Sequence, residues 1–326
     1  MKILKKNPNE DFVILNLTDT QLTNAEWDEG CEKRKILEYT VSKLINEIDP
    51  DLITLTGDLA WAGHDVAYDS LAELLDSYNI PWAPVWGNHD NQGGAEKIDE
   101  LADRYLKHPL CIYEKGDPKL GNGNYVIAIE ENGKIVEGII MIDSHDRMPY
   151  TAEDGTTSNK WAKLLPEQLV WYKEQIEALK KLGCNETTVM MHIPIYAYRN
   201  AWAAAANPNI DPKSVTPDTC TDPNNWNEGY KDSYGVKYEG VGSYPTEDGV
   251  LDVIREMNST KYVISGHEHV NNYMINYKGV KLIYSLKTGA GCYWNPILNG
   301  GTVIRISSDG VSDIHHHYVD VTSLLS

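Results

Sequence analysis

Short apolar runs alternate with amphipathic stretches through the early part of this 326-residue sequence. Residues 12–18 (FVILNLT), 52–57 (LITLTG) and 82–87 (WAPVWG) are mostly apolar, and we expect them to be buried strands. Between them, apolar residues recur at the spacing of a helix. This alternation is typical of βαβ units, so the pattern predicts an α/β fold with a largely parallel sheet.

The later part of the sequence is expected to add strands and helices to the same domain. Two apolar runs around residues 131–133 predict a β-hairpin, and residues 169–179 have the spacing of an amphipathic helix. Residues 187–192 and 261–266 are expected to be further strands. A single domain over residues 1–326 is expected, because one α/β domain can reach this length.

The segment from about Ala197 to Thr246 breaks these patterns, because Asn, Pro, Asp, Gly, Trp and Tyr replace any regular spacing. A connection this long in a compact domain is commonly a functional cover. We therefore expect a lid insertion at about 197–246, with a disordered or merely packing insertion as the alternative. Its rings are expected to face a cleft and select the substrate. They are Trp202, Trp226, Tyr230, Tyr234 and Tyr238.

The balance of charge excludes some classes of partner. With 48 acidic and 29 basic residues the formal net charge is −19, so no binding to a nucleic-acid backbone or a membrane is expected. The five cysteines form no CxxC pair, which argues against a disulfide framework and a thiolate zinc site. A cytoplasmic location is expected for the sequence as written, and secretion is the alternative if a signal peptide was removed.

Polar motifs follow five of the expected strands. Sites in open α/β sheets lie at the carboxyl ends of strands, so we expect these side chains to converge. Carboxylate, amide and imidazole donors without sulfur are typical ligands of divalent first-row metals. The motifs are Asp19-Thr20-Gln21, Gly57-Asp58, Gly87-Asn88-His89-Asp90, His192 and Gly266-His267-Glu268-His269.

The ordered set of motifs resembles that of the calcineurin-like metallophosphoesterases, D-x-(H), GD, GNH(D/E), H and GHxH, and it spans residues 19–269. Residues 266–291 and His192-Ile193-Pro194 resemble, more loosely, a purple-acid-phosphatase-like branch. The resemblance implies an α/β sandwich of two mixed β-sheets flanked by helices. It also implies two divalent metal ions, with Mn, Fe and Zn all compatible.

The family's ligand positions carry over residue by residue. Asp58 would bridge the two ions. Gln21 stands where most members have histidine, and its amide is a weaker donor, so the first ion is expected to bind loosely or to take a water there. The implied ligands are Asp19, Asp58 and His269 for the first ion, and Asp58, Asn88, His192 and His267 for the second.

The resemblance also implies catalytic roles. His89 would act as general acid or transition-state stabiliser, with Asp90 orienting its imidazole. A hydroxide bridging the two ions would attack phosphorus. Trp61 occupies the position of a metal-binding tyrosine in purple acid phosphatases, so no tyrosinate–iron colour is expected.

These features together predict a phosphoric ester hydrolase, with a phosphomonoesterase acting on a small-molecule phosphate ester as the first expectation. A phosphodiesterase acting on a nucleotide or lipid head-group type of substrate is the first alternative. The second is a non-catalytic metal-binding protein whose first site has decayed. Protein substrates are less expected, because the arginine-containing stretch of protein phosphatases is missing after Asp58.

Two other polar groups have weaker claims to function. Asp143 to Asp146 end an expected strand and are candidates for substrate contact, since loops after strands often carry function. His315 to His317 are expected to be an exposed or edge-strand run and not a metal site.

Overall fold

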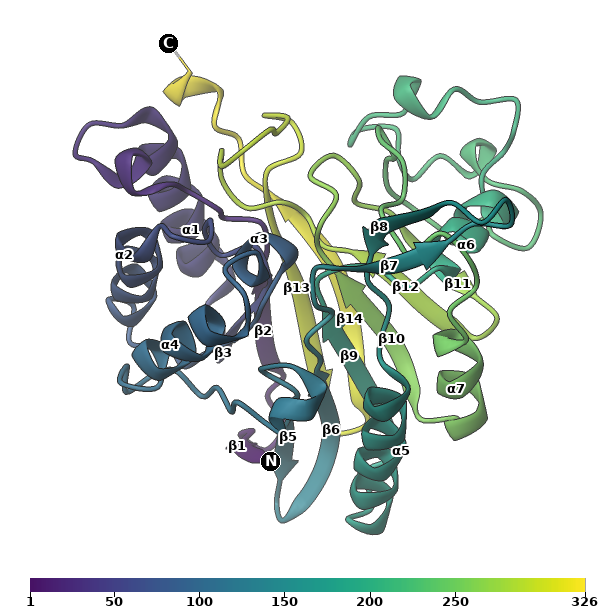
Figure 1. Cartoon of the computed structure of the whole chain (residues 1–326), viewed down its shortest axis with the longest axis horizontal. Coiled ribbons are helices and arrows are strands. Elements are labelled where there is room, and N and C mark those ends of the chain that lie inside the picture. The colour runs from purple at the N-terminus through teal and green to yellow at the C-terminus, as the bar shows by residue number, and fades with distance from the viewer. Residues whose placement is uncertain (326) are drawn as a thin grey trace.

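The computed structural model describes residues 1–325 and contains two β-sheets packed together, with helices on both outer sides (Figure 1). Both sheets mix parallel and antiparallel pairs. The expected sandwich is therefore confirmed. The larger sheet has the order β1 (Lys2–Lys5), β5 (Tyr125–Glu131), β6 (Lys134–Met141), β9 (Thr187–Met191), β10 (Thr260–Ser265), β12 (Val280–Tyr284) and β11 (Met274–Tyr277). The smaller has the order β14 (Gly310–Tyr318), β13 (Gly300–Ser307), β2 (Phe12–Leu17), β3 (Leu52–Thr56) and β4 (Trp82–Val85).

The side chains of β5 illustrate how the larger sheet buries both of its faces. Ile127 and Ile129 lie in the core cluster shared with the smaller sheet, whereas Val126 and Ala128 lie in the cluster shared with α5 (Pro166–Lys181). Successive strand residues point to opposite faces, so two covered faces require an unbroken apolar run. Burial of each large apolar side chain contributes about 1.5–3 kcal/mol.

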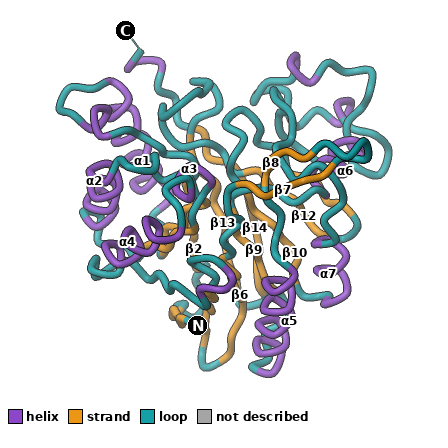
Figure 2. The backbone as a smooth tube through the Cα atoms, viewed as in Figure 1, coloured by secondary structure: helices purple, strands orange, loops and turns teal. Residues whose placement is uncertain are grey.

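Helices cover the outer face of each sheet (Figure 2). Their apolar residues recur at helical spacing, as the buried Val41, Leu44 and Ile48 of α1 (Glu32–Ile48) show. No helix within residues 1–325 is long and apolar enough to cross a membrane. The smaller sheet carries α1 (Glu32–Ile48), α2 (Asp65–Asp76) and α4 (Ala95–Tyr105), and the larger carries α5, α6 (Ala197–Ala205) and α7 (Val250–Met257).

Some elements were not anticipated from the sequence. They are the edge strand β1, the single turn α3 (Asn88–Asn91), the helices α4 and α6, and a two-stranded hairpin of β7 (Arg147–Thr151) and β8 (Thr157–Trp161). The three-histidine run, by contrast, lies on the edge strand β14 as expected. Short 3-10 turns occupy Asn24–Trp27, Pro118–Leu120, Pro212–Ser214, Pro223–Asn225 and Thr322–Leu324.

The expected lid segment packs its rings into the protein. Trp226 is 1% exposed, and the ring of Trp202 lies 5.6 Å from it and 5.0 Å from that of Tyr273. Tyr230 packs on the same core cluster, and Tyr234 and Tyr238 pack on a smaller one. The prediction that the five rings face the substrate cleft is therefore wrong, because each gains burial by packing on the sheet or its connections. A role as a lid stays a prediction.

Candidate metal centre

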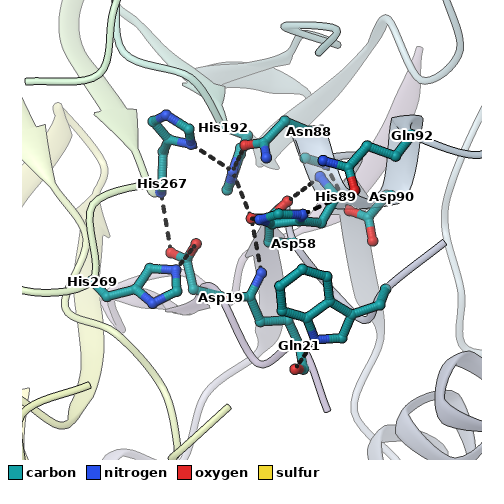
Figure 3. Close-up of polar contacts among 12 residues, drawn as sticks. Asp19, Gln21, Asp58, Asn88, His89, Asp90, Gln92, His192, His267 and His269 are labelled. Atoms are coloured by element: carbon teal, nitrogen blue, oxygen red, sulfur yellow. Dashed lines mark hydrogen bonds and ion pairs between the residues drawn. The ribbon is translucent and has the colours of Figure 1, made fainter. Parts of the chain in front are cut away.

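Five loops bring the polar motifs together at one end of the sandwich (Figure 3). Each loop follows the carboxyl end of a strand, namely β2, β3, β4, β9 or β10. Within each sheet these strands run parallel to one another, so their carboxyl ends share an edge. The motif side chains there are buried, except that of His89, which is 23% exposed.

Glycines in the motifs let these loops approach one another closely. A Cβ on Gly87 would lie 2.2 Å from Asp58 Oδ1, and a Cβ on Gly266 would lie 2.0 Å from Thr18 Oγ1. No side chain fits at such distances. The GNHD and GHEH motifs therefore require their glycines for packing of the loops, independently of any chemistry.

Three of the motif residues have an unusual backbone conformation. Asp19, Asp58 and His267 have φ angles of 55°, 51° and 81°. Positive φ is uncommon for residues other than glycine and costs free energy, so it persists only where the surroundings impose it. Here it turns the side chains of these residues towards a common point (Figure 3).

Two overlapping sets of side chains offer closely spaced ligand atoms. The atoms offered by Asp19, Asp58 and His269 lie within 4.8 Å of one another, and so do those of Asp58, His192 and His267. Asp58 belongs to both sets, as two neighbouring ions that share a carboxylate would require. The structure thus brings together the residues that the resemblance implies, and their role as ligands stays a prediction.

Two of the imidazoles are held in the orientation expected of metal ligands. His192 and His269 each donate Nδ1–H to a backbone carbonyl, at 2.8 and 2.7 Å. Their Nε2 atoms face carboxylates, with His192 3.2 Å from Asp58 Oδ2 and His269 3.3 Å from Asp19 Oδ1. Such outer hydrogen bonds fix the tautomer and ring orientation of a ligating histidine.

The buried charges of the site are strongly coupled. Burial would lower the pKa of His192, but the charge of Asp58 raises it to about 10. Burial and the charge of His192 together lower the pKa of His267 to about 3. Burial would raise the pKa of Asp19, yet the charge of His269 holds it well below its usual range. The carboxylates are therefore ionised in a buried place that favours cations.

Unpaired oxygens provide a test of whether metal ions fit here. Gln21 Nε2 donates to Asp58 Oδ2 at 3.0 Å, while its Oε1 is buried and has no hydrogen-bond partner within residues 1–325. Asp19 Oδ1 likewise accepts no hydrogen bond within that range, and its contact is with His269 Nε2 at 3.3 Å. Asn88 directs Oδ1 to His192 Nε2 at 3.0 Å. Buried unpaired oxygens are costly. Oxygen and imidazole donors in this arrangement fit divalent cations.

His89 lies at the exposed rim of this group. Its backbone N–H donates to Asp58 Oδ1 at 2.9 Å, and its Nε2 lies 4.0 Å from Asp58 Oδ2. The ring packs on Trp61 with centroids 4.1 Å apart, and Nδ1 donates to Gln92 Oε1 at 3.1 Å. Trp61 itself donates Nε1–H to the backbone oxygen of Gln21. Trp61 therefore supports the His89 ring and fixes the Gln21 loop.

Asp90 does not orient the imidazole of His89, and that prediction is wrong. Its carboxylate accepts hydrogen bonds from the backbone N–H groups of Leu59 and Gly87, at 3.1 and 2.7 Å, and from Tyr68 Oη at 2.7 Å. Burial and the charge of Asp58 raise the pKa of Asp90 to about 7. Asp90 therefore joins the loop after β3 to the loop after β4. Gln92, not Asp90, contacts the His89 imidazole.

His89 and four of the predicted ligands line a cavity of about 400 Å³. These ligands are Asp58, Asn88, His267 and His269. Several of its other lining residues had no signal in the sequence, because they are scattered along the chain. The ring of Trp161 lies 4.5 Å from that of His267, and the ring of Tyr293 stacks on that of His269 at 4.1 Å. Among these other lining residues, Arg199 on α6 is the one that lies close in the sequence to a motif residue, His192.

Part of the cavity is bounded by residues 239–242. They end a stretch of the expected lid, residues 236–242, which is here called the wall segment. It pairs with the loop after the GHEH motif through backbone hydrogen bonds. Asn271 Oδ1 accepts two further backbone N–H groups of the wall segment, at 3.0 and 3.1 Å, and Glu268 accepts a third. These bonds fix the wall to the loop that carries two predicted ligands.

The candidates at Asp143 to Asp146 lie next to this cavity. Asp143, His145 and Asp146 line a separate cavity of about 480 Å³ that also contacts Asn91 of α3. Asp143 Oδ1 accepts a hydrogen bond from Asn91 Nδ2 at 3.2 Å. They do not line the cavity of the predicted ligands, so their contact with substrate stays a prediction.

A model of the calcineurin-like phosphoesterase family matches residues 12–271. The chain is 26% identical to the probable inactive purple acid phosphatase 28 of Arabidopsis thaliana, over 78% of this chain and 62% of that protein. It is 24% identical to phosphatase DCR2 of Saccharomyces cerevisiae, over 93% of this chain and 52% of that protein. The chain thus spans only part of the length of these relatives.

Two further similarities are more limited. A probable cyclic nucleotide phosphodiesterase of Moraxella catarrhalis is 38% identical over 25% of this chain and 28% of that protein. One solved structure superimposes with a TM-score of 0.50 over 94% of this chain and 99% of that chain, at 11% identity, which concerns the fold alone. The family model, however, matches most of the chain and includes every motif residue. The chain therefore belongs to the calcineurin-like phosphoesterase family.

Proposed function

We propose that this chain is a metal-dependent phosphoric ester hydrolase, and specifically a phosphomonoesterase acting on a small-molecule phosphate ester. One observation supports this proposal above all: the buried carboxylate of Asp58 belongs to two neighbouring sets of ligand atoms, and one histidine of each set, His269 or His267, lines the same cavity as Asp58. A two-ion site suits phosphate esters, because two cations can hold the phosphate oxygens and activate water between them.

The predicted ligands would divide between two ions. Bound divalent ions supply Lewis acidity and lower the pKa of water, so that no protein nucleophile is needed. Mn, Fe and Zn all suit these oxygen and nitrogen donors. The first ion would be held by Asp19, Gln21, Asp58 and His269, and the second by Asp58, Asn88, His192 and His267.

His89 would exchange a proton with the leaving oxygen. Its Nδ1 donates to Gln92 Oε1, which leaves Nε2 as the ring atom free to act in the cavity. Packing on Trp61 restrains the ring, so the proton would be presented at a defined place. A positioned proton donor of this kind typically contributes about 10²- to 10⁴-fold to the rate.

A non-catalytic protein with a decayed first site is the opposing hypothesis. The name of the Arabidopsis relative, which includes "inactive", gives it weight for that protein. In this chain only Gln21 departs from the family's usual ligand set, and its unpaired Oε1 is still an oxygen donor. A decayed site would be expected to have lost several donors, so the filled positions support an enzyme.

A phosphodiesterase is the second candidate within the enzyme class. The local similarity to a probable cyclic nucleotide phosphodiesterase favours it, but covers only a quarter of this chain. The similarity to the yeast phosphatase covers 93% of the chain, which supports the monoesterase as the first choice.

The location of the protein is proposed to be a reducing compartment such as the cytoplasm. All five cysteines are free thiols, and two of them are buried. Proteins of oxidising compartments more often pair their cysteines in disulfides.

The experiment uses protein stripped of metal and reconstituted separately with Mn, Fe or Zn. Each preparation is assayed on phosphomonoesters, phosphodiesters and nucleotides, with Asp58→Asn as the inactive control. Hydrolysis of monoesters that needs restored metal and is lost in the variant is the expected result. Preference for diesters would select the second candidate, and metal binding without hydrolysis of any ester would contradict an enzyme.

A further inference from the structure

Arg199 is a cation that lines the cavity beside the predicted metal ligands. The residue lies on α6, and its side chain is held by Ser243. Nε donates to Ser243 Oγ at 2.8 Å, and Nη2 donates to the backbone oxygen of Ser243 at 3.4 Å. These bonds fix the plane of the guanidinium while leaving Nη1–H groups free to bind something in the cavity.

The charge of Arg199 is not matched by a contacting carboxylate. Within residues 1–325 no carboxylate oxygen lies within 4.0 Å of its guanidinium nitrogens, although the chain has 48 acidic residues against 29 basic ones. Glu239 lines the same cavity, but its carboxylate accepts hydrogen bonds from Tyr293 Oη, at 2.9 and 3.0 Å, and from a backbone N–H. Arg34 and Arg104, by comparison, each have a carboxylate within 3.0 Å.

A fixed guanidinium with free donors is suited to one class of ligand. Its planar array of N–H groups matches the two oxygens of a carboxylate or of a phosphate, and such charge-assisted pairs are among the strongest hydrogen bonds in proteins. The phosphate that is cleaved would be held at the predicted metal ligands, so Arg199 is available for a different part of the substrate.

We propose that Arg199 binds a second anionic group of the substrate, a carboxylate or a second phosphate. This inference rests on the proposed function and narrows it to phosphate esters whose leaving group is itself negatively charged. It makes Arg199 a specificity-determining residue of the cavity. The proposal also explains why a chain with a net charge of −19 keeps a cation at this place.

A purely structural role for Arg199 predicts something different. Its bonds to Ser243 tie α6 to the end of the expected lid, and their loss would disturb the cavity for all ligands alike. A role in specificity instead changes the ratio of the binding affinities for ligands with and without the second anion. The test therefore measures ratios, in which a general disturbance cancels.

The test compares binding of three aryl phosphonates, which cannot be hydrolysed, to metal-reconstituted protein by calorimetric titration. The ligands are phenylphosphonate, 4-phosphonobenzoate and 1,4-phenylenebisphosphonate. In the wild-type protein the two ligands that carry a second anionic group, 4-phosphonobenzoate and 1,4-phenylenebisphosphonate, should bind more tightly than phenylphosphonate. Arg199→Met should reduce that preference by about 10- to 100-fold, the range for loss of a charge-assisted contact. Arg199→Lys should restore part of it, and Arg255→Met, at an exposed pair away from the cavity, should leave it unchanged.

Equal weakening of all three ligands in Arg199→Met would overturn the proposal and leave Arg199 as a tether. An unchanged preference would overturn it as well. A larger loss for the benzoate than for the bisphosphonate would identify a carboxylate as the second anion, and the reverse would identify a phosphate. Hydrolysis of the corresponding phosphate esters, measured alongside, tests the proposed function separately, because the binding ratios do not depend on turnover.

Discussion

The group of predicted metal ligands, here called the floor, and the wall segment of the cavity are built in different ways. The floor consists of side chains placed directly after strand ends, with glycines packed between the loops and imidazoles tied to backbone carbonyls. The wall segment belongs to a long connection and is held by hydrogen bonds to the loop after the GHEH motif. The predicted metal ligands are thus fixed to the sheets, whereas the residues proposed to distinguish substrates lie on a long connection, the kind of segment that varies most among related proteins.

The largest effect is expected at the rim of the floor. His89→Ala should lower kcat by about 10²- to 10⁴-fold through loss of the proton donor, while both metal ions are retained. Steady-state kinetics and metal analysis on the same samples measure the two quantities. His315→Ala, at an exposed histidine paired with Asp313, is the control. Loss of metal from the His89 variant would make this residue a ligand and extend the floor to it.

A smaller effect is expected from loosening the wall. Asn271→Ala removes the acceptor of two backbone N–H groups of the wall segment, and unsatisfied groups cost about 1–3 kcal/mol. We expect a higher KM with an unchanged metal content. The control Asn276→Ala replaces an exposed amide on β11. An unchanged KM would show that the wall segment does not contribute to substrate binding. A loss of metal would show that wall and floor do not act separately.

The larger sheet carries a buried acid, Glu137, whose effect on the pH dependence of stability can be measured separately from the predicted metal ligands. Burial raises the pKa of Glu137 to about 8, and Thr188 Oγ1 donates to its carboxyl at 3.0 Å. The folded protein keeps this proton up to that pH, whereas the unfolded chain releases it near the ordinary value of 4.5. Its contribution to stability is therefore present at low pH and is lost as pH rises towards 8.

Glu137→Gln should remove the loss of stability that Glu137 causes as pH rises. Relative to wild type, its free energy of unfolding should rise with pH between about 4.5 and 8, with a limiting slope of about 1.4 kcal/mol per pH unit. Denaturant unfolding at several pH values measures it. Parallel pH profiles of the two proteins would show that Glu137 is not protonated in the fold, and altered metal content would show that this part of the sheet and the floor are coupled.

The smallest effect is expected at Gln21, the weakest donor of the floor. Gln21→His should tighten the first ion by about tenfold or less, because imidazole nitrogen is a better donor than an amide oxygen. The change also removes the hydrogen bond from Gln21 Nε2 to Asp58 Oδ2, which limits the gain. Calorimetric metal titration should show two sites that are more nearly equal. Two sites of unchanged affinity would show that position 21 does not reach the ion.

The floor could be predicted from the sequence because its residues occur in short motifs at strand ends. Apolar runs located β2, β3, β4, β9 and β10. The order of the motifs indicated that the loops after strands of the two sheets form one site. The role of Asp90 was missed, because it depends on which N–H groups the folded loops direct towards it. No spacing in the sequence reveals that Gln92, not Asp90, contacts His89 Nδ1.

The wall could not be predicted, because its contacts join residues far apart in the chain. Trp161 reaches the cavity from a hairpin with polar and exposed strands, which has no apolar run to reveal it. The expected lid segment was read as irregular, yet α6 buries Tyr198 and Ala201 against the larger sheet. The aromatic residues of this segment pack in the core, and its residues that line the cavity are polar or small. The composition, by contrast, predicts aromatic rings in the cavity.

We propose that the carboxylate of Asp58 holds both metal ions. The most direct measurement is the metal content per chain after dialysis, for wild type, Asp58→Ala and the control Asp232→Ala, which changes an exposed acid. Two ions in the wild type and control, and neither in Asp58→Ala, are the expected result, because each set of ligand atoms includes this carboxylate. An Asp58→Ala protein that still holds two ions would show that this carboxylate is not their shared ligand.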